Sequence, residues 1–237
     1  FTSGSTGLPK GVEISYINFI SCLFHQIKNL KYRRNKEIIS DYHDPSFVMS
    51  VVIIFPAVFL NSQISPLIDS VDKLFPTRHM IENKISALIT VPSFILFLKE
   101  GLKKKKIKLH NLILCGENFP LNILDLILNS FKVDNIFNCY GSTETSPWAF
   151  FFHFKQKFYE LIKKNGQVPI GNPFKDLRIK FSKSGELLIH GPIISKGYIA
   201  EDKMNKEKFI NINNNIFYKT GDIVKKIKGL YFCKGRN

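Results

Sequence analysis

Apolar runs and helix-like segments alternate through the first two thirds of the chain. Short apolar runs predict strands at residues 38–40, 63–68, 87–91, 112–115 and 135–139. Segments with helical character predict helices at residues 50–60, 80–84 and 121–131. Pro92 stands where another helix should begin, because proline is well tolerated at the first helical position. This alternation predicts a mostly parallel, helix-covered sheet, and therefore an α/β fold.

The pattern changes near Gly166. Short strands separated by turns are expected at residues 177–181, 186–190, 223–227 and 231–233. Ser184-Gly185 and Lys228-Gly229 are turn signals typical of hairpins, which indicates antiparallel pairing. We therefore predict an α/β core subdomain at residues 1–165 and a small β-rich subdomain at residues 166–237.

Composition and charge narrow the possible classes of protein. Hydrophobic residues make up 44% and charged residues 22%, which is typical of a globular protein and excludes disorder of the whole chain. The net charge of +15 would suit a nucleic-acid partner. However, the positive charge is nearly all lysine in a chain rich in Lys, Asn, Ile and Phe, a mixture that codon bias in an AT-rich genome produces. We interpret residues 103–106 as a solvated loop and expect no nucleic-acid binding.

Cysteine usage and hydropathy indicate the compartment. Cys22, Cys115, Cys139 and Cys233 form no CxxC pair, so the spacing of zinc ligands is absent. Cys115 and Cys139 each end an apolar run and are predicted to be buried thiols. We find no signal peptide and no apolar run long enough to span a bilayer. A reduced, cytoplasmic setting without a membrane span is expected.

The first segment with candidate chemistry lies at the start of the chain. Its glycines allow close backbone approach to a ligand, while its hydroxyls and one lysine supply the donors and the cation that a polyphosphate needs. The residues concerned are Thr2, Ser3, Gly4, Ser5, Thr6, Gly7 and Lys10. Pro9 and Gly11 flank Lys10, so the segment is not a Walker A loop. Taken alone, a Ser/Gly linker remains an equal alternative.

The second segment runs from Asn138 to Glu144 and follows a predicted strand. It should therefore lie at the carboxyl edge of the sheet, where ligands bind in open α/β folds. Tyr140 offers a ring for stacking on a base, Thr143 can donate to a phosphate, and Glu144 can hold Mg²⁺. Taken alone, an ordinary turn with a surface glutamate is the favoured interpretation.

Two further segments complete the set. Tyr218 to Asp222 places a carboxylate after a tight turn, which suits the two ribose hydroxyls. Gly235-Arg236 supplies a cation near the chain end. Alone, these are an aspartate in a turn and a solvated terminus.

The order and spacing of the four segments resemble the core motifs of the adenylate-forming superfamily. That superfamily includes acyl-CoA synthetases, luciferases and the adenylation domains of nonribosomal peptide synthetases. Further matches lie at residues 115–120, 168–173, 185–191 and 196–198, so that the resemblance covers essentially the whole chain. The Pro-Ile-Gly and Gly-Glu-Leu segments lean toward peptide synthetases and D-alanine–carrier protein ligases.

The resemblance implies ATP and Mg²⁺ as cofactors, with activation of a carboxylic acid as its acyl-AMP and release of pyrophosphate. The segment from Thr2 to Lys10 would hold the β- and γ-phosphates, and Thr143 the α-phosphate. The other implied nucleotide contacts are Gly116 and Glu117 at the adenine pocket, Asn138 near the adenine amino group, Tyr140 on the ring with Gly141 and Ser142 beside it, and Asp222 and Arg236 at the ribose. Lys10, Thr143 and Glu144 would form the catalytic group, and Glu144 would hold Mg²⁺.

The resemblance does not decide which thiol accepts the acyl group, or whether this chain is catalytically active. The acyl group would pass to the phosphopantetheine thiol of a carrier protein or to coenzyme A, with the carrier slightly favoured. Family members also have a subdomain before Phe1 and a mobile lid after Asn237, so we expect an incomplete core without its lid and with exposed apolar surface. A catalytically incompetent nucleotide-binding or scaffold fragment of the same fold is the alternative.

The sequence departs from the family pattern where the substrate should bind. Amino-acid-activating members carry a Phe-Asp-x-Ser segment, whereas Val48 takes the place of that aspartate here. Valine cannot balance a buried ammonium group. Either the substrate is not an ordinary α-amino acid, or Asp44 takes over the role. Smaller departures are Tyr16, where many members carry histidine, and Cys233, where some carry tyrosine.

Overall fold

The structure is a computed structural model that describes residues 1–3, 9–45, 47–67, 70–101 and 107–236. The chain divides into two compact units, each built from segments that are distant in sequence. We call Gln26–Cys139 with Phe152–Pro169 the parallel unit. Phe1–His25, Tyr140–Phe151 and Ile170–Asn237 form the antiparallel unit. The division at residues 165 and 166 stays a prediction about the domains.

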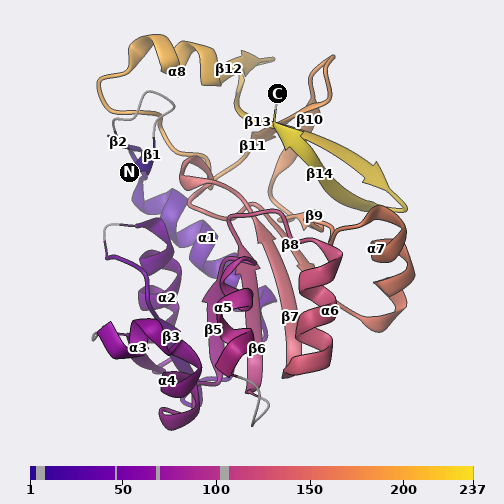
Figure 1. The fold of residues 1–237 in the computed structure, drawn as a ribbon. Helices are drawn as coiled ribbons and strands as arrows, with labels where there is room; N and C mark the ends of the chain where they lie inside the picture. Colours follow the sequence, from indigo (N-terminus) through magenta and orange to yellow (C-terminus); the bar gives the residue numbers. More distant parts are fainter. Residues whose placement is uncertain (4–8, 46, 68–69, 102–106, 237) are drawn as a thin grey trace. The chain divides into compact units, whose positions relative to one another are not determined.

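The parallel unit contains a sheet whose strands follow the order β4-β3-β5-β6-β7, with every neighbouring pair parallel (Figure 1). The strands are β3 (Ile38–Asp41), β4 (Gln63–Pro66), β5 (Ala87–Thr90), β6 (Lys108–Cys115) and β7 (Lys132–Tyr140). The helices are α2 (Val48–Phe59), α3 (Ser70–Leu74), α4 (Pro76–Glu82), α5 (Phe94–Gly101), α6 (Leu121–Ser130), the short η2 (Gln156–Phe158) and α7 (Tyr159–Asn165). The predicted α/β architecture with a mostly parallel sheet is confirmed.

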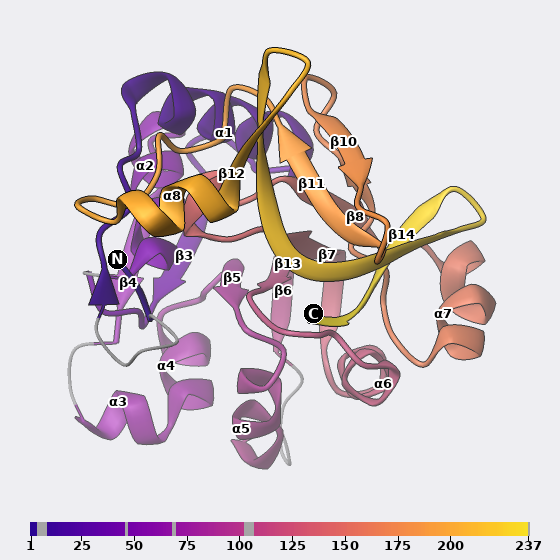
Figure 2. The same cartoon turned by 90° about the horizontal axis from the view of Figure 1, so that it is seen from above.

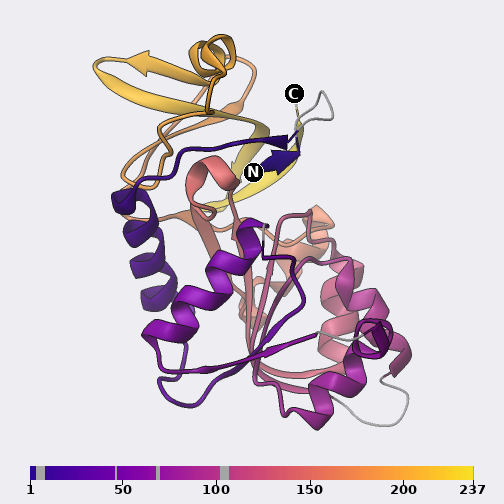
Figure 3. The same ribbon diagram turned by 90° about the vertical axis from the view of Figure 1, so that its left-hand side faces the viewer.

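Helices cover both faces of this sheet. Helix α2 lies on one face, and α5 and α6 lie on the other (Figures 2 and 3). Strand β5 is buried along its whole length, as expected for a central strand covered on both sides. Helix α6 buries Ile123, Leu124 and Ile127, which share one helical face. Cys115 and Cys139 are buried at 1% and 3% exposure, as predicted.

The carboxyl ends of the central strands share one edge. Thr90 pairs with Leu114, and Cys115 pairs with Cys139, in parallel register. The segments that follow β6 and β7 therefore begin at the same edge of the sheet. This edge is where ligands bind in open α/β folds.

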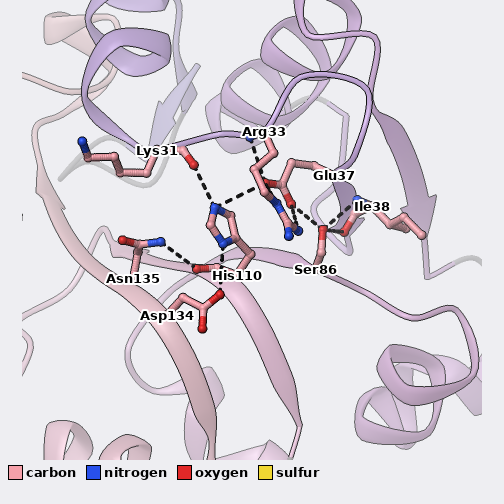
Figure 4. Close-up of polar contacts among 8 residues, drawn as sticks. All are labelled: Lys31, Arg33, Glu37, Ile38, Ser86, His110, Asp134 and Asn135. Atoms are coloured by element: carbon pink, nitrogen blue, oxygen red, sulfur yellow. Dashed lines mark hydrogen bonds and ion pairs between the residues drawn. The ribbon is translucent and has the colours of Figure 1, made fainter.

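A polar network lies at the opposite, amino end of the strands (Figure 4). The buried Glu37 carboxylate accepts hydrogen bonds from Arg33 Nε at 3.1 Å and Arg33 Nη2 at 3.2 Å, and a further bond from the Ser86 hydroxyl. Beside it, His110 contacts Asp134 through Nδ1 at 3.1 Å. Burial raises the pKa of Glu37, but the hydrogen bonds from Arg33 and Ser86 together outweigh burial and lower the pKa overall.

Replacing Glu37 by glutamine is expected to lower the free energy of unfolding at neutral pH by about 2 kcal/mol, because the change breaks a hydrogen-bonded ion pair whose carboxylate is buried. With its pKa lowered in the fold, Glu37 stabilises the protein above the unfolded-state pKa of about 4.3. This contribution is lost as the pH falls through the folded-state pKa. Urea unfolding should therefore show a constant difference near neutral pH that shrinks below about pH 4.

Glu82 supplies a matched control for this prediction. It forms the same i,i+4 pair with Arg78 at 2.8 Å, but both side chains are exposed. Glu82→Gln should change the free energy of unfolding by less than about 0.5 kcal/mol. If Glu37→Gln and Glu82→Gln lowered the free energy of unfolding equally, the stabilising role of the buried network would be contradicted.

The antiparallel unit is built around a five-stranded sheet in the order β10-β11-β13-β12, with β14 paired to β13. Its strands are β10 (Arg178–Phe181), β11 (Glu186–His190), β12 (Phe209–Ile212), β13 (Asn215–Ile227) and β14 (Leu230–Arg236). The further elements are β1 (Thr2–Ser3), β2 (Pro9–Lys10), α1 (Tyr16–Asn29, which continues into the parallel unit), η1 (Thr143–Thr145), β8 (Phe150–His153, which also continues there), β9 (Asn172–Pro173) and α8 (Asp202–Lys208). Figure 2 shows β13 as one long curved strand.

The predicted hairpins are present in this sheet. Strands β13 and β14 are joined at Lys228-Gly229, whose φ angles of 48° and 82° suit the tight primed turns of two-residue hairpins. Strands β10 and β11 are joined through Gly185, with φ of 85°. The predicted antiparallel pairing is therefore confirmed.

Exposed apolar side chains occur on α2, although its other side is buried. Phe55, Val58 and Phe59 are exposed at 45%, 72% and 59%. This agrees with the apolar surface expected from the sequence. Within the described part of the chain, no helix is both long and apolar enough to cross a membrane.

Candidate functional site

The first candidate segment forms a small hairpin. Strands β1 and β2 pair antiparallel, with Thr2 opposite Lys10 and Ser3 opposite Pro9. Gly4, Ser5, Thr6 and Gly7 lie outside the described residues, as do residues 103–106. The Lys10 ammonium lies 3.5 Å from the Met204 sulfur. A thioether is only a weak acceptor, so this contact leaves the positive charge of Lys10 to act on an anion.

The chain leaving this hairpin is held by a distant segment. Residues 11–13 run antiparallel to residues 196–199, joined by backbone hydrogen bonds of 2.9 to 3.0 Å. Val12 and Tyr198 are bridge partners in this short ladder. The position of the Lys10 strand is thus coupled to the segment that carries Tyr198.

A compact turn follows β7 and carries the second candidate segment. The Ser142 amide donates to Thr145 Oγ1 at 2.8 Å, and the Thr145 amide donates to the Ser142 carbonyl at 2.9 Å. Gly141 lies where a Cβ atom would stand 2.1 Å from the Pro147 carbonyl oxygen, so no larger residue fits. The turn leaves Thr143 half-buried and Glu144 buried.

Glu144 is 5% exposed, and its Oε1 accepts a hydrogen bond of 2.6 Å from the Tyr198 hydroxyl. Among the described residues it makes no ion pair, although a buried carboxylate needs compensation. A hard cation would provide that compensation. No cluster of three metal-ligating side chains occurs within the described ranges, but Mg²⁺ commonly uses one or two carboxylates with water and substrate phosphates. The donor at Glu144 therefore fits Mg²⁺.

Asp222 forms a second polar centre in the same unit. Its Oδ2 accepts from the Tyr140 hydroxyl at 2.6 Å, and its Oδ1 accepts from Arg236 Nε at 3.1 Å. Asp222 and Arg236 are direct partners across β13 and β14. Burial and then the Asp222 charge raise the pKa of Tyr140, while the Asp222 charge raises the pKa of Arg236. The Tyr140 ring packs edge-on against Phe150, with centroids 5.6 Å apart.

The three other predicted nucleotide contacts belong to the parallel unit. Gly116 follows β6 with φ of 81°, and Glu117 is exposed there. Glu117 accepts from the Ser93 amide at 3.0 Å and from the Ser93 hydroxyl at 2.9 Å. Asn138, near the end of β7, is buried and donates to the Pro169 carbonyl at 3.0 Å. All three residues lie at or beyond the carboxyl end of their strands.

The predicted substrate residues lie at the beginning of α2. Val48 is the first residue of the helix and is half-buried, while Asp44 is exposed in the preceding turn. The Asp44 carbonyl accepts from the Phe47 amide at 2.9 Å. Asp41, which the sequence did not single out, is another carboxylate near this place, because it ends β3. Burial raises the pKa of Asp41.

Two site residues were missed by reasoning from the sequence. Tyr198 and Tyr218 were noted only as parts of motifs, yet both are buried, and both lie beside Glu144. Their aromatic character gave no sign of a polar partner. A signal could have come only from knowing which segments meet in the fold.

Comparisons with known proteins agree on one family. Residues 1–199 match the family described as AMP-binding enzyme. The chain is 29% identical over 257 residues to the D-alanine–D-alanyl carrier protein ligase of Bacillus velezensis, covering all of this chain and 49% of the ligase. The Staphylococcus aureus protein of the same name is also 29% identical, over 246 residues, with the same coverage. The chain therefore spans about half the length of these curated relatives.

Solved structures show the same fold. The Vibrio cholerae adenylation domain AlmE, in complex with glycyl-adenosine-5′-phosphate, matches with a TM-score of 0.87 at 24% identity, covering 100% of this chain and 47% of that one. The Bacillus subtilis O-succinylbenzoate coenzyme A synthetase MenE, in complex with ATP and magnesium, matches with a TM-score of 0.79 at 20% identity. The match to MenE covers 99% of this chain and 49% of that one.

Proposed function

Because the chain belongs to the AMP-binding enzyme family, we propose that it carries the nucleotide-binding part of an enzyme that activates a carboxylic acid with ATP. The carboxylate oxygen of the acid attacks the α-phosphorus, the bond to the β,γ-diphosphate breaks, and acyl-AMP and pyrophosphate result. The buried Glu144 carboxylate, which lacks an ion-pair partner among the described residues, is the observation that carries this proposal. Such a carboxylate suits the metal that accompanies ATP.

The residues of the chain would divide the work by their chemistry. Lys10 and the hydroxyls of Thr2, Ser3, Ser5 and Thr6 would hold the outer phosphates, with glycines Gly4 and Gly7 between them, and Thr143 would donate to the α-phosphate. Bound at Glu144, Mg²⁺ would neutralise phosphate charge. Because charge builds up on the α-phosphate in the transition state, electrostatic stabilisation would provide most of the rate enhancement. The substrate carboxylate is the nucleophile, so no side chain need form a covalent bond.

The nucleoside contacts are assigned from the motifs. The Tyr140 ring, followed by Gly141 and Ser142, would stack on adenine, and the resemblance also assigns Gly116, Glu117 and Asn138 to adenine. The Asp222 carboxylate would accept from the ribose hydroxyls, supported by Arg236. These assignments rest on the resemblance of the motifs and on the polar centre that Tyr140, Asp222 and Arg236 form.

The substrate class and acceptor follow from the relatives by analogy. We propose a small carboxylic acid, with small amino acids first among the candidates, because two relatives are named as ligases for D-alanine and AlmE is bound to glycyl-adenosine-5′-phosphate. Asp44 or Asp41 would then pair with the ammonium group in place of the aspartate that Val48 replaces. A carrier-protein thiol is the proposed acceptor, and coenzyme A is the alternative acceptor.

Substrate-dependent exchange between ATP and labelled pyrophosphate tests the proposal. The assay is applied to the protein that carries this chain, with amino, hydroxy, aryl and fatty acids as substrates. Exchange with one acid would establish adenylation and name the substrate. MgATP binding without exchange for any acid would favour the alternative function, a nucleotide-binding scaffold, for which the replacement by Val48 is the specific observation.

Asp222→Ala is expected to raise the KM for ATP about tenfold with a smaller effect on kcat, because a ribose contact is made in both the ground state and the transition state. Initial rates at varied ATP concentration measure both constants. Asp176→Ala is the control, since Asp176 forms an ion pair with His25 at 2.7 Å and is not among the proposed nucleotide contacts. Equal KM values for Asp222→Ala and wild type would rule out the ribose role.

A further inference from the structure

We propose that Tyr198, supported by Tyr218, is a positioning residue that directs the Glu144 carboxylate so that its second oxygen is presented to Mg²⁺. This inference rests on the proposed function. The Tyr198 hydroxyl donates to Glu144 Oε1 at 2.6 Å, and the two residues are 8% and 5% exposed. A short hydrogen bond to an ionised group is stronger than one between neutral groups. Oε1 is therefore engaged, and in this proposal Oε2 binds the cation.

The main chain of Tyr198 is held from two sides, which fixes where its hydroxyl can lie. On one side it pairs with Val12 in the ladder that joins residues 11–13 to residues 196–199. On the other side the Asn205 side chain accepts from the Tyr198 amide at 2.7 Å and donates to the Tyr198 carbonyl at 2.8 Å. A group held in place by its surroundings before the ligand arrives binds more tightly, because less order is lost on binding.

Gly197 shows how closely the Asn205 side chain approaches the backbone beside Tyr198. A Cβ atom at Gly197 would stand 2.6 Å from Asn205 Oδ1, and the φ angle of 128° favours glycine. The close approach of Asn205 to the backbone therefore depends on the glycine. Asn205 belongs to α8, which thus contributes to the placement of the Tyr198 hydroxyl.

Tyr218 completes the surroundings of the carboxylate. It is 5% exposed on β13, and its phenol interacts with both Tyr198 and Glu144.

Tyr198 also links Lys10 and Glu144, the two charged residues of the proposed phosphate site. Residues 11–13 directly follow Lys10, and their ladder partner segment carries Tyr198, whose hydroxyl holds Glu144. Lys10 and Glu144 are thus related through one tyrosine. Tyr198 lies opposite Val12 in the ladder, and its hydroxyl donates to Glu144.

The test is Tyr198→Phe, which removes only the hydroxyl, in the protein that carries this chain. Calorimetric titration measures ATP affinity as a function of Mg²⁺ concentration and again in excess chelator. We expect the half-saturating Mg²⁺ concentration to rise about tenfold, as for loss of one hydrogen bond to a charged group. The affinity for ATP without metal should not change. Tyr218→Phe should give a smaller rise, of about threefold.

Tyr159→Phe is the matched control. The Tyr159 hydroxyl donates to Asp125 at 2.7 Å, so the control loses the same kind of bond outside the proposed nucleotide contacts. It should leave the Mg²⁺ requirement unchanged. Thermal unfolding of every variant shows whether the fold is kept, and Tyr218→Phe serves as the test if Tyr198→Phe does not fold.

A double-mutant cycle separates positioning from a structural effect. In a Glu144→Gln background, Tyr198→Phe should produce no further change in the Mg²⁺ requirement. A wild-type Mg²⁺ requirement in Tyr198→Phe, or an effect that persists in the Glu144→Gln background, would overturn the inference while leaving the proposed function standing. A wild-type protein without metal-dependent ATP binding would overturn both.

Discussion

Glu144→Ala is expected to lower the rate of substrate-dependent ATP–pyrophosphate exchange by about two to three orders of magnitude. The carboxylate is buried and makes no ion pair among the described residues, so its proposed role is to hold the cation that stabilises charge on the phosphates. Removal of one preorganised stabilising group commonly costs a factor of about 10² to 10³ in kcat. Exchange rates at saturating ATP and acid provide the measurement.

Glu144→Gln distinguishes charge from shape. Glutamine keeps the size of the side chain and can still accept from the Tyr198 hydroxyl, but it carries no negative charge. Loss of exchange comparable to that of Glu144→Ala would show that charge is required. Exchange at the wild-type rate in Glu144→Gln would remove the metal-binding role from this residue.

Gly141→Ala should lower the free energy of unfolding by more than about 3 kcal/mol. Because the turn carries Thr143 and Glu144, ATP–pyrophosphate exchange should be lost as well. The new Cβ atom would stand 2.1 Å from the Pro147 carbonyl oxygen and 2.8 Å from the Trp148 Cα atom. Both are backbone atoms, so no change of rotamer relieves the clash. Urea unfolding followed by circular dichroism measures the loss.

Gly166→Ala is the control for this substitution. Its φ of 72° makes alanine strained, but no atom lies within 4 Å of the new Cβ. The expected cost is therefore only about 1 to 2 kcal/mol, from the left-handed backbone conformation alone. Similar losses at the two glycines would contradict the steric account of the turn after β7.

The alternation of elements could be predicted because buried central strands appear as continuous apolar runs. Residues 87–91 were predicted as a strand, and β5 covers Ala87–Thr90 with every residue buried. Strand β13 was only partly predicted, at residues 223–227, whereas it extends over Asn215–Ile227. Apolar and polar residues alternate little in the first half of β13, and Gly221, with φ of 77°, interrupts the strand pattern. Local periodicity does not identify such a strand.

Helices α1, α3, α7 and α8 were not predicted from the sequence. Helix α1 carries apolar side chains on its exposed side as well, with Tyr16 and Ile17 exposed at 77% and 67%. The two faces of α1 nevertheless differ clearly in hydrophobicity, so the sequence carried a signal that was not used. Helix α8 has no buried residue and no apolar stripe to reveal it. Predicted helix ends also shifted, since α4 begins at Pro76 and ends at Glu82, whereas residues 80–84 were expected.

Candidate site residues were found through motif order, and their partners were not. Tyr198 and Glu144 are 54 positions apart, and Tyr140 and Asp222 are 82 positions apart. Both separations in sequence far exceed the length of one helix or strand, so local spacing does not pair these residues. Tertiary structure is what brings three of the four motifs, together with Tyr198, into two polar centres.

The ladder between residues 11–13 and residues 196–199 has a consequence for biosynthesis. Glu13 and Lys196, which it brings together at 2.8 Å, are 183 positions apart. A chain that emerges from the ribosome starting at its amino end cannot form this pairing until the later segment has been made. Contacts of such long range also slow folding, because loop closure must come first. Residues 11–13, which follow the lysine-bearing strand, therefore gain their native partners only after most of the chain has been translated, and until then their backbone groups are open to other pairings.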